Sequence, residues 1–161
     1  MRVFLNYTSN KDDFGEVALF RKHLEMELKN FDPGAKVIQD LAVISPGQAY
    51  PKRLEEELIK SDVLIVHLSP AWLQSEWCRW EYETFTSDEN KAQSVIPLLV
   101  VTTPSVRPDS TDNIASKLSQ LEYTDIRQLR HQSWDTTEKR LYAAKLAEIV
   151  NAMVTGQGSD A

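Results

Sequence analysis

Residues 62–68 read Asp-Val-Leu-Ile-Val-His-Leu, a nearly unbroken apolar run that is rich in β-branched side chains. A strand with one face in water alternates apolar and polar residues, whereas this run is apolar at almost every position. It therefore predicts a strand that is covered on both faces, as in a parallel sheet between two layers of helices. Residues 94–101 form a second run of this kind, in which Pro97 predicts a bulge or an edge position because proline lacks the backbone N–H.

Shorter apolar runs and helical patterns alternate along the rest of the chain. Further strands are expected at residues 2–6, 36–39 and 123–126. Helices are expected from residue 14 to a stop at 32–34, from Pro51 onward, from 71 to about 85, over 113–120 and over 136–154. This alternation predicts an α/β fold in which a five-stranded parallel sheet carries helices on both faces. Ligands of such sheets bind at the carboxyl ends of the strands.

Two helices allow more detailed predictions. Ser69 and Ser75 are interpreted as helix-start caps, because a serine hydroxyl accepts a hydrogen bond from a backbone N–H in the first turn. The last helix is expected to pack inward through Tyr142, Leu146, Ile149, Val150 and Met153.

Composition narrows the functional classes. A net charge of −6 and an isoelectric point near 5.1 argue against a basic surface for nucleic acids or anionic membranes, while small anionic ligands stay open. Cys78 is the one cysteine, so no internal disulfide is expected and a reducing, cytoplasmic location is favoured. Neither a signal peptide nor an apolar stretch of about 18 residues is apparent. We expect one domain over residues 1–155 and a disordered tail over 156–161.

Three segments near the expected strand ends carry a recognisable pattern. Residues 3–9 read Val-Phe-Leu-Asn-Tyr-Thr-Ser and span the end of the first strand, and residues 40–50 contain Ser-Pro-Gly and end at Tyr50. Residues 68–81 read Leu-Ser-Pro-Ala-Trp-Leu-Gln-Ser-Glu-Trp-Cys-Arg-Trp-Glu. Together they resemble the first and second boxes and the Ser-x-Trp-Cys-x-x-Glu segment of Toll/interleukin-1 receptor (TIR) domains, while Ser133-Trp134 is similar to the third box. The resemblance implies the flavodoxin-like TIR fold.

The enzymatic branch of the TIR family cleaves NAD+ at the nicotinamide–ribose bond. The resemblance implies that Glu81 is catalytic and that NAD+ is a substrate rather than a cofactor. No metal site is expected, because His23, His67 and His131 share no ligand-like spacing. Implied substrate-binding residues are Tyr7, Thr8, Ser9, Lys11, Asp40 and Trp77. The implied assembly loop contains Ser45, Pro46, Gly47 and Tyr50. Other TIR domains are the implied partners, in a homo-oligomer or filament that switches the activity on, in prokaryotic immune signalling, antiphage defence or virulence.

The spacing of Trp77 and Glu81 places their side chains on one face of a helix, an indole beside a carboxylate. Cleavage of an N-ribosyl bond builds positive charge on the ribose, as in glycoside hydrolysis. A single carboxylate suffices when the leaving group is already cationic, whether it stabilises that charge, holds the ribose hydroxyls or attacks the anomeric carbon. The residues alone leave these roles open, and they leave the product open among ADP-ribose, a cyclic isomer and a base-exchange dinucleotide.

Other interpretations of the same residues remain. Glu81 lies in an acidic stretch and, without the Trp-Cys-x-x-Glu context, would be interpreted as a solvated surface residue. Cys78 without a histidine partner is interpreted as a small buried hydrophobe. A non-catalytic TIR adaptor, acting through homotypic contacts of the 40–50 loop, is the alternative function, and a nucleoside deoxyribosyltransferase-like enzyme is a third.

Overall fold

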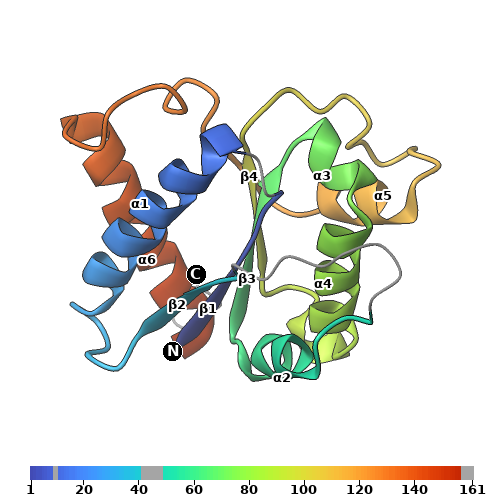
Figure 1. Ribbon diagram of the computed structural model, residues 1–161, viewed down its shortest axis with the longest axis horizontal. Coiled ribbons are helices and arrows are strands. Elements are labelled where there is room, and N and C mark those ends of the chain that lie inside the picture. Colours follow the sequence, from blue (N-terminus) through green and yellow to red (C-terminus); the bar gives the residue numbers. More distant parts are fainter. Residues whose placement is uncertain (9–10, 41–48, 157–161) are drawn as a thin grey trace.

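The computed structural model describes residues 1–8, 11–40 and 49–156 (Figure 1). Its strands form one sheet in the order β2-β1-β3-β4-β5, and every strand pair is parallel. The strands are β1 (Arg2–Asn6), β2 (Lys36–Gln39), β3 (Val63–Leu68), β4 (Val95–Leu99) and β5 (Thr124–Asp125). This order is that of flavodoxin-like folds, so the predicted fold class is confirmed.

Helices cover both faces of the sheet, as Figure 1 shows, with α1 and α6 on one side and α2 to α5 on the other. The helices are α1 (Lys11–Leu28), α2 (Lys52–Lys60), α3 (Pro70–Gln74), α4 (Glu76–Thr86), α5 (Asn113–Ser119) and α6 (Thr137–Thr155), with a 3₁₀ turn η1 (Glu89–Lys91). In the part of the chain that the structure describes, none of these helices has the length and apolar character needed to cross a bilayer.

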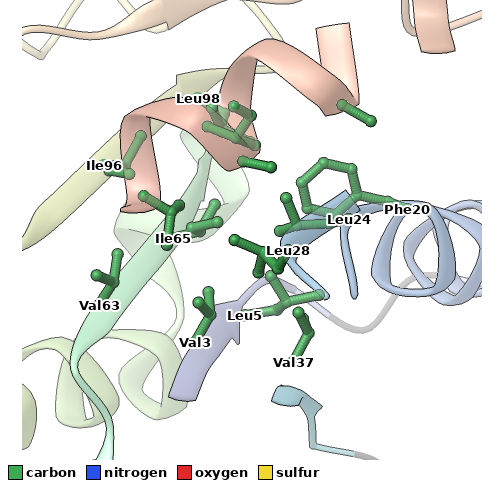
Figure 2. Close-up of a cluster of buried hydrophobic side chains, with 14 of the residues drawn as sticks. Val3, Leu5, Phe20, Leu24, Leu28, Val37, Val63, Ile65, Ile96 and Leu98 are labelled. Atoms are coloured by element: carbon green, nitrogen blue, oxygen red, sulfur yellow. The ribbon is translucent and has the colours of Figure 1, made fainter. Parts of the chain in front are cut away.

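The central strand β3 divides the core into two clusters. Val63 and Ile65 pack against α1 and α6, whereas Leu64 and Val66 pack against α2 to α5. Figure 2 shows the first cluster, in which Leu24 of α1 meets side chains from several strands. All four of these β3 residues are fully buried, which confirms a strand covered on both faces.

Pro97 lies inside β4 without a bulge. The register with β3 runs unbroken and pairs Pro97 with Val66, so of the two predicted alternatives the bulge is wrong, whereas on the side of β5 Pro97 has no strand partner among the described residues, as at an edge. The N–H of Val100, directly after β4, donates to Leu68 of β3. Backbone N–H groups along a strand point alternately to its two sides, so Pro97, three residues before Val100, has its nitrogen on the opposite side, toward β5. Since β5 pairs only with Leu98 and Leu99, the missing donor of Pro97 costs no ladder bond.

The predicted helix from 71 to about 85 is two helices, so that prediction was wrong. The backbone leaves the helical region at Ser75, whose side chain accepts a hydrogen bond from the N–H of Cys78 at 3.2 Å. Ser69 caps α3 in the same way through the N–H of Trp72 at 3.1 Å, so the cap interpretation of both serines is confirmed. Helix α4 therefore has its own start, and its direction is set independently of α3.

Two helix predictions need smaller corrections. Helix α1 begins at Lys11, earlier than residue 14. On α6, Ile149 is 38% exposed and does not belong to the inner face, which contains the predicted Leu146 and Val150 together with Ala143 and Ala147. Residues 143, 147 and 150 are three or four apart and share one face, and position 149 lies at its border.

Candidate functional site

Glu81 is buried in α4, with only 2% of its surface exposed. Its Oε2 is shielded from solvent and has no hydrogen-bond partner among the described residues. Burial raises the pKa of this carboxyl well above its usual value, the charge of Asp40 raises it further, and a hydrogen bond from the Trp77 side chain opposes both. The interpretation of Glu81 as a solvated surface residue is therefore wrong.

The end of β1 holds α4 in place. The side chain of Asn6, the last residue of β1, is fully buried and donates from Nδ2 to the carbonyl oxygen of Cys78 at 3.1 Å. This bond ties the first turn of α4 to the carboxyl end of the strand and so brings Glu81 to that edge of the sheet. Sequence reasoning did not identify Asn6, although a polar residue directly after an apolar run was the available signal.

Tyr7 and Asp40 lie at the same edge. The Tyr7 hydroxyl donates to the backbone carbonyl of Asp40 at 2.7 Å. Burial raises the pKa of Tyr7, and the nearby acidic groups Asp40 and Glu81 add to this effect. The structure thus brings together Tyr7, Asp40 and Glu81 from three separate segments, as expected for a site at the ends of β1 and β2.

Three aromatic rings gather beside Glu81. Tyr50 stacks on Trp80 with ring centroids 4.2 Å apart and planes 6° from parallel. The Trp77 ring lies 5.5 Å from Tyr50 and 6.0 Å from Trp80, and both tryptophans are half-buried. Tyr50, which the sequence placed in an assembly loop, therefore anchors the segment after that loop to the helix that carries Glu81.

Several predicted site residues lie outside the described residues. These are Ser9, Ser45, Pro46 and Gly47, together with the side chain of Lys11. Thr8 is half-buried and lines a cavity described next.

A cavity of about 350 Å³ opens at the carboxyl ends of β1, β3 and β4, on the face covered by α1 and α6. Tyr7 and Thr8 line it, whereas Glu81 does not. Trp134, expected as the third-box aromatic, is also in the wall and donates from Nε1 to Glu16 at 3.1 Å. The Glu81 site lies on one face of this edge of the sheet and the cavity on the other, and Tyr7 belongs to both.

Other chemistries find little support in the described part of the chain. Cys78 is buried, and burial raises the pKa of its thiol to about 12, so the thiol stays protonated and packs as a small hydrophobe, as predicted. Among the described residues, no group of three or more His, Cys, Asp or Glu side chains is arranged to hold a metal ion.

Comparison with known proteins gives a consistent result. Residues 3–142 match the family model of the TIR domain. A stretch of 97 residues is 28% identical to the NAD(+) hydrolase TirS of Staphylococcus aureus (strain MSSA476), covering 60% of this chain and 32% of that protein. The matched stretch thus spans about a third of the relative's length.

Among solved structures, a prokaryotic SEFIR domain superimposes with a TM-score of 0.52 at 14% identity, over 92% of this chain and 91% of that one. The TIR domains of the activated Roq1 resistosome, which directly recognises the pathogen effector XopQ, give a TM-score of 0.49 at 17% identity, over 99% and 98% of the two chains. The SEFIR likeness supports the fold alone.

Proposed function

Because the chain belongs to the TIR domain family, we propose that it cleaves NAD+ at the nicotinamide–ribose bond, with Glu81 as the carboxylate at the reacting carbon. One observation carries this proposal: a buried glutamate at the carboxyl edge of the sheet, one helical turn after a half-buried tryptophan, has an oxygen that no described group satisfies. An unsatisfied buried carboxyl costs about 1–3 kcal/mol or more, so it is a group whose partner is expected to be a ligand.

The chemistry suits a single acidic group. In hydrolysis the bond between the ribose C1′ and the ring nitrogen breaks, its electron pair neutralises the departing nicotinamide, and water adds to C1′ with release of one proton to solvent. Positive charge therefore moves from the ring to the ribose. A carboxylate beside C1′ stabilises this charge, and no acid is needed for the leaving group.

The protonation state of Glu81 responds to the substrate. The pKa of the carboxyl in the free protein is raised chiefly by burial. A cationic nicotinamide ring within a few ångströms favours the ionised form and lowers that pKa. Binding of NAD+ is thus expected to drive a proton from Glu81 and to create the carboxylate where the reaction needs it.

The remaining predicted residues take supporting roles in this proposal. Trp77 packs against the nicotinamide or ribose, while Tyr7, Thr8 and Asp40, with Ser9 and Lys11, bind the rest of the dinucleotide. The loop of Ser45, Pro46 and Gly47 contacts a neighbouring copy, and Tyr50 fixes the end of that loop against Trp80. Self-assembly would then complete the pocket and switch on the activity, in the cytoplasm and in immune or antiphage signalling or virulence.

The relative TirS supports the proposal because its name records an NAD(+) hydrolase. A direct test incubates concentrated protein with NAD+ and follows nicotinamide release by chromatography. The Glu81→Ala variant should lose at least 100-fold in rate, whereas Glu83→Ala, which removes an exposed carboxylate from the same helix, should not.

Two outcomes would refute the proposal. Equal release by wild type and Glu81→Ala would remove the role of Glu81. If assembled protein released no nicotinamide, the remaining hypothesis would be a non-catalytic adaptor. In that case the 40–50 loop binds other TIR domains and NAD+ stays intact.

A further inference from the structure

The cavity on the face of α1 and α6 lies where ligands of flavodoxin-like folds bind. In the sheet, β2 lies on one side of β1 and β3 on the other, so the crevice between the carboxyl ends of β1 and β3 is the point at which the strand order reverses. Residues that follow these two strands line the cavity, namely Tyr7 and Thr8 after β1 and residues 69–71 after β3. The cavity therefore has the position of a ligand site.

The wall of the cavity is mainly apolar and extends from the surface into the core. Pro70 and Ala71 are exposed, whereas Phe20 and Trp134 are at most 6% exposed. The Phe20 ring lies 6.1 Å from the Trp134 ring and 6.3 Å from the Tyr142 ring, with which it is stacked. Aromatic walls favour a planar ring, which packs against them by offset stacking or edge to face.

The volume of the cavity indicates the size of its occupant. At about 350 Å³ it falls within the range of about 300–1,000 Å³ that is typical of ligand pockets. An apolar cavity of about 150 Å³ takes up benzene. A cavity of more than twice that volume has room for two or three aromatic rings.

The charged groups of the wall already have partners. Lys139 donates from Nζ to the carboxylate of Glu16 and, at 2.7 Å, to the backbone carbonyl of Gln132. Arg130, the other charged residue of the wall, also has an interaction of its own. An ionic ligand would lose its hydration on entry and would find no unpaired charge in the described wall. The charge distribution thus favours a neutral ligand.

The polar groups of the wall are also engaged or out of reach. The unpaired Nδ1 of His67 and hydroxyl of Tyr142 are shielded from solvent, so a ligand in the cavity does not contact them. The Ser69 hydroxyl accepts a hydrogen bond from the N–H of Trp72 at 3.1 Å, and the Tyr7 hydroxyl donates to the end of β2. Recognition therefore depends chiefly on shape and apolar contact.

We propose that this cavity binds a neutral, planar aromatic molecule of two or three rings. The rings pack against Phe20 and Trp134 at the buried end and against the half-buried Val100 and Val101 nearer to solvent. Glu81 does not line the cavity, and its helix α4 packs on the opposite face of the sheet. The site is therefore distinct from the one proposed for NAD+ cleavage.

The dye N-phenyl-1-naphthylamine tests the proposal, because it is neutral and aromatic and fluoresces strongly only in apolar surroundings. Its titration into the wild type should saturate at one dye per chain. Ala71→Trp places a large side chain at the exposed end of the cavity and should weaken binding at least tenfold. Ala92→Trp makes the same change at an exposed alanine outside the wall and should leave binding unchanged. Binding that does not saturate, or equal binding by the two variants, would overturn the proposal.

Chemical shifts of the ¹⁵N-labelled wild type locate the bound ring without a variant. Addition of 2-naphthol should shift the indole N–H of Trp134 and the amides of Val100 and Val101. The indoles of Trp77 and Trp80 pack against the other cluster and should not shift. Shifts confined to those two indoles would overturn the proposal. Naphthalene-2-carboxylate should bind at least tenfold more weakly than 2-naphthol, and equal affinity would contradict a neutral ligand.

NAD+ serves as the competitor, because Tyr7 belongs both to the cavity and to the surroundings of Glu81. The dye is bound to the Glu81→Gln variant, which should not consume NAD+, and an excess of NAD+ is added. The dye should stay bound. Its displacement would assign the cavity to the dinucleotide and overturn the proposal of a distinct site. Since dye binding is measured without NAD+ cleavage, the two proposals can fail independently.

Discussion

Replacement of Glu81 by glutamine should change how the stability of the protein depends on pH. The pKa of Glu81 in the folded chain is raised well above the 4.5 of an exposed glutamate, first by burial and then by Asp40. The folded state therefore binds the proton more tightly than the unfolded state does. The contribution of Glu81 to stability is fully present below pH 4.5 and is progressively lost as pH rises toward its folded pKa. Glutamine cannot ionise, so the Glu81→Gln variant lacks this loss.

The size of the effect follows from linkage. Each pH unit between the unfolded and folded pKa values costs the wild type about 1.4 kcal/mol relative to the variant. For a chain of 161 residues, 1 kcal/mol corresponds to about 2–4 °C in Tm. The difference in Tm between the Glu81→Gln variant and the wild type, called the gap below, should therefore grow by about 3–6 °C per pH unit. Below pH 4.5 the gap should stop changing with pH, whatever constant offset the amide introduces.

The assay is thermal unfolding followed by circular dichroism from pH 4 to pH 9, with both proteins in the same buffers. Glu83→Gln serves as the control, since Glu83 is exposed on the same helix and its replacement should give a gap nearly independent of pH. A Glu81→Gln gap that stays constant, or one that shrinks as pH rises, would refute the assignment of Glu81 as a buried and uncompensated carboxyl.

Three further predictions concern the surroundings of Glu81. Tyr50→Ala removes the stack on Trp80 and should cost about 0.5–1.5 kcal/mol in urea unfolding; an unchanged midpoint would contradict that anchor. Asn6→Ala removes the donor to the Cys78 carbonyl and should cost about 1–3 kcal/mol in the same assay, and wild-type stability would show that this bond does not hold α4. Because Glu81 must ionise, kcat/KM for NAD+ should fall about tenfold for each pH unit below the raised pKa of Glu81 in the free protein. The midpoint of the kcat profile should lie at lower pH, since bound NAD+ lowers that pKa. A kcat/KM that does not change with pH would exclude a carboxylate role for Glu81.

The sequence predicted the sheet because the information lies in contiguous residues. The apolar run of 63–68 identifies a strand buried on both faces without knowledge of its neighbours, and β3 is such a strand. The break at Ser75 was harder to predict, because helical periodicity continues through it and only the cap reveals the new start. The prediction that Ile149 lies on the inner face of α6 was wrong for a related reason. Periodicity identifies which face of a helix packs inward, but it does not show how far around the helix the neighbouring elements cover it.

The candidate site was predictable only in part. The spacing of Trp77 and Glu81 correctly indicated side chains close together on one helix. The groups around Glu81 come from elsewhere in the chain: Asn6 at the end of β1 bonds to the first turn of α4, and the charge of Asp40 after β2 acts on Glu81, contacts that no local pattern relates to α4. The cavity on the other face was not predicted at all, because its wall joins residues as distant as Phe20 and Tyr142.

Nicotinamide release is the most direct measurement of whether Glu81 acts on NAD+. Wild type and Glu81→Gln, which keeps the size of the side chain, are compared over a series of protein concentrations. We expect the wild-type rate per molecule to increase with concentration as copies assemble, and the glutamine variant to stay at the background of NAD+ alone. A glutamine variant as active as the wild type would contradict the account.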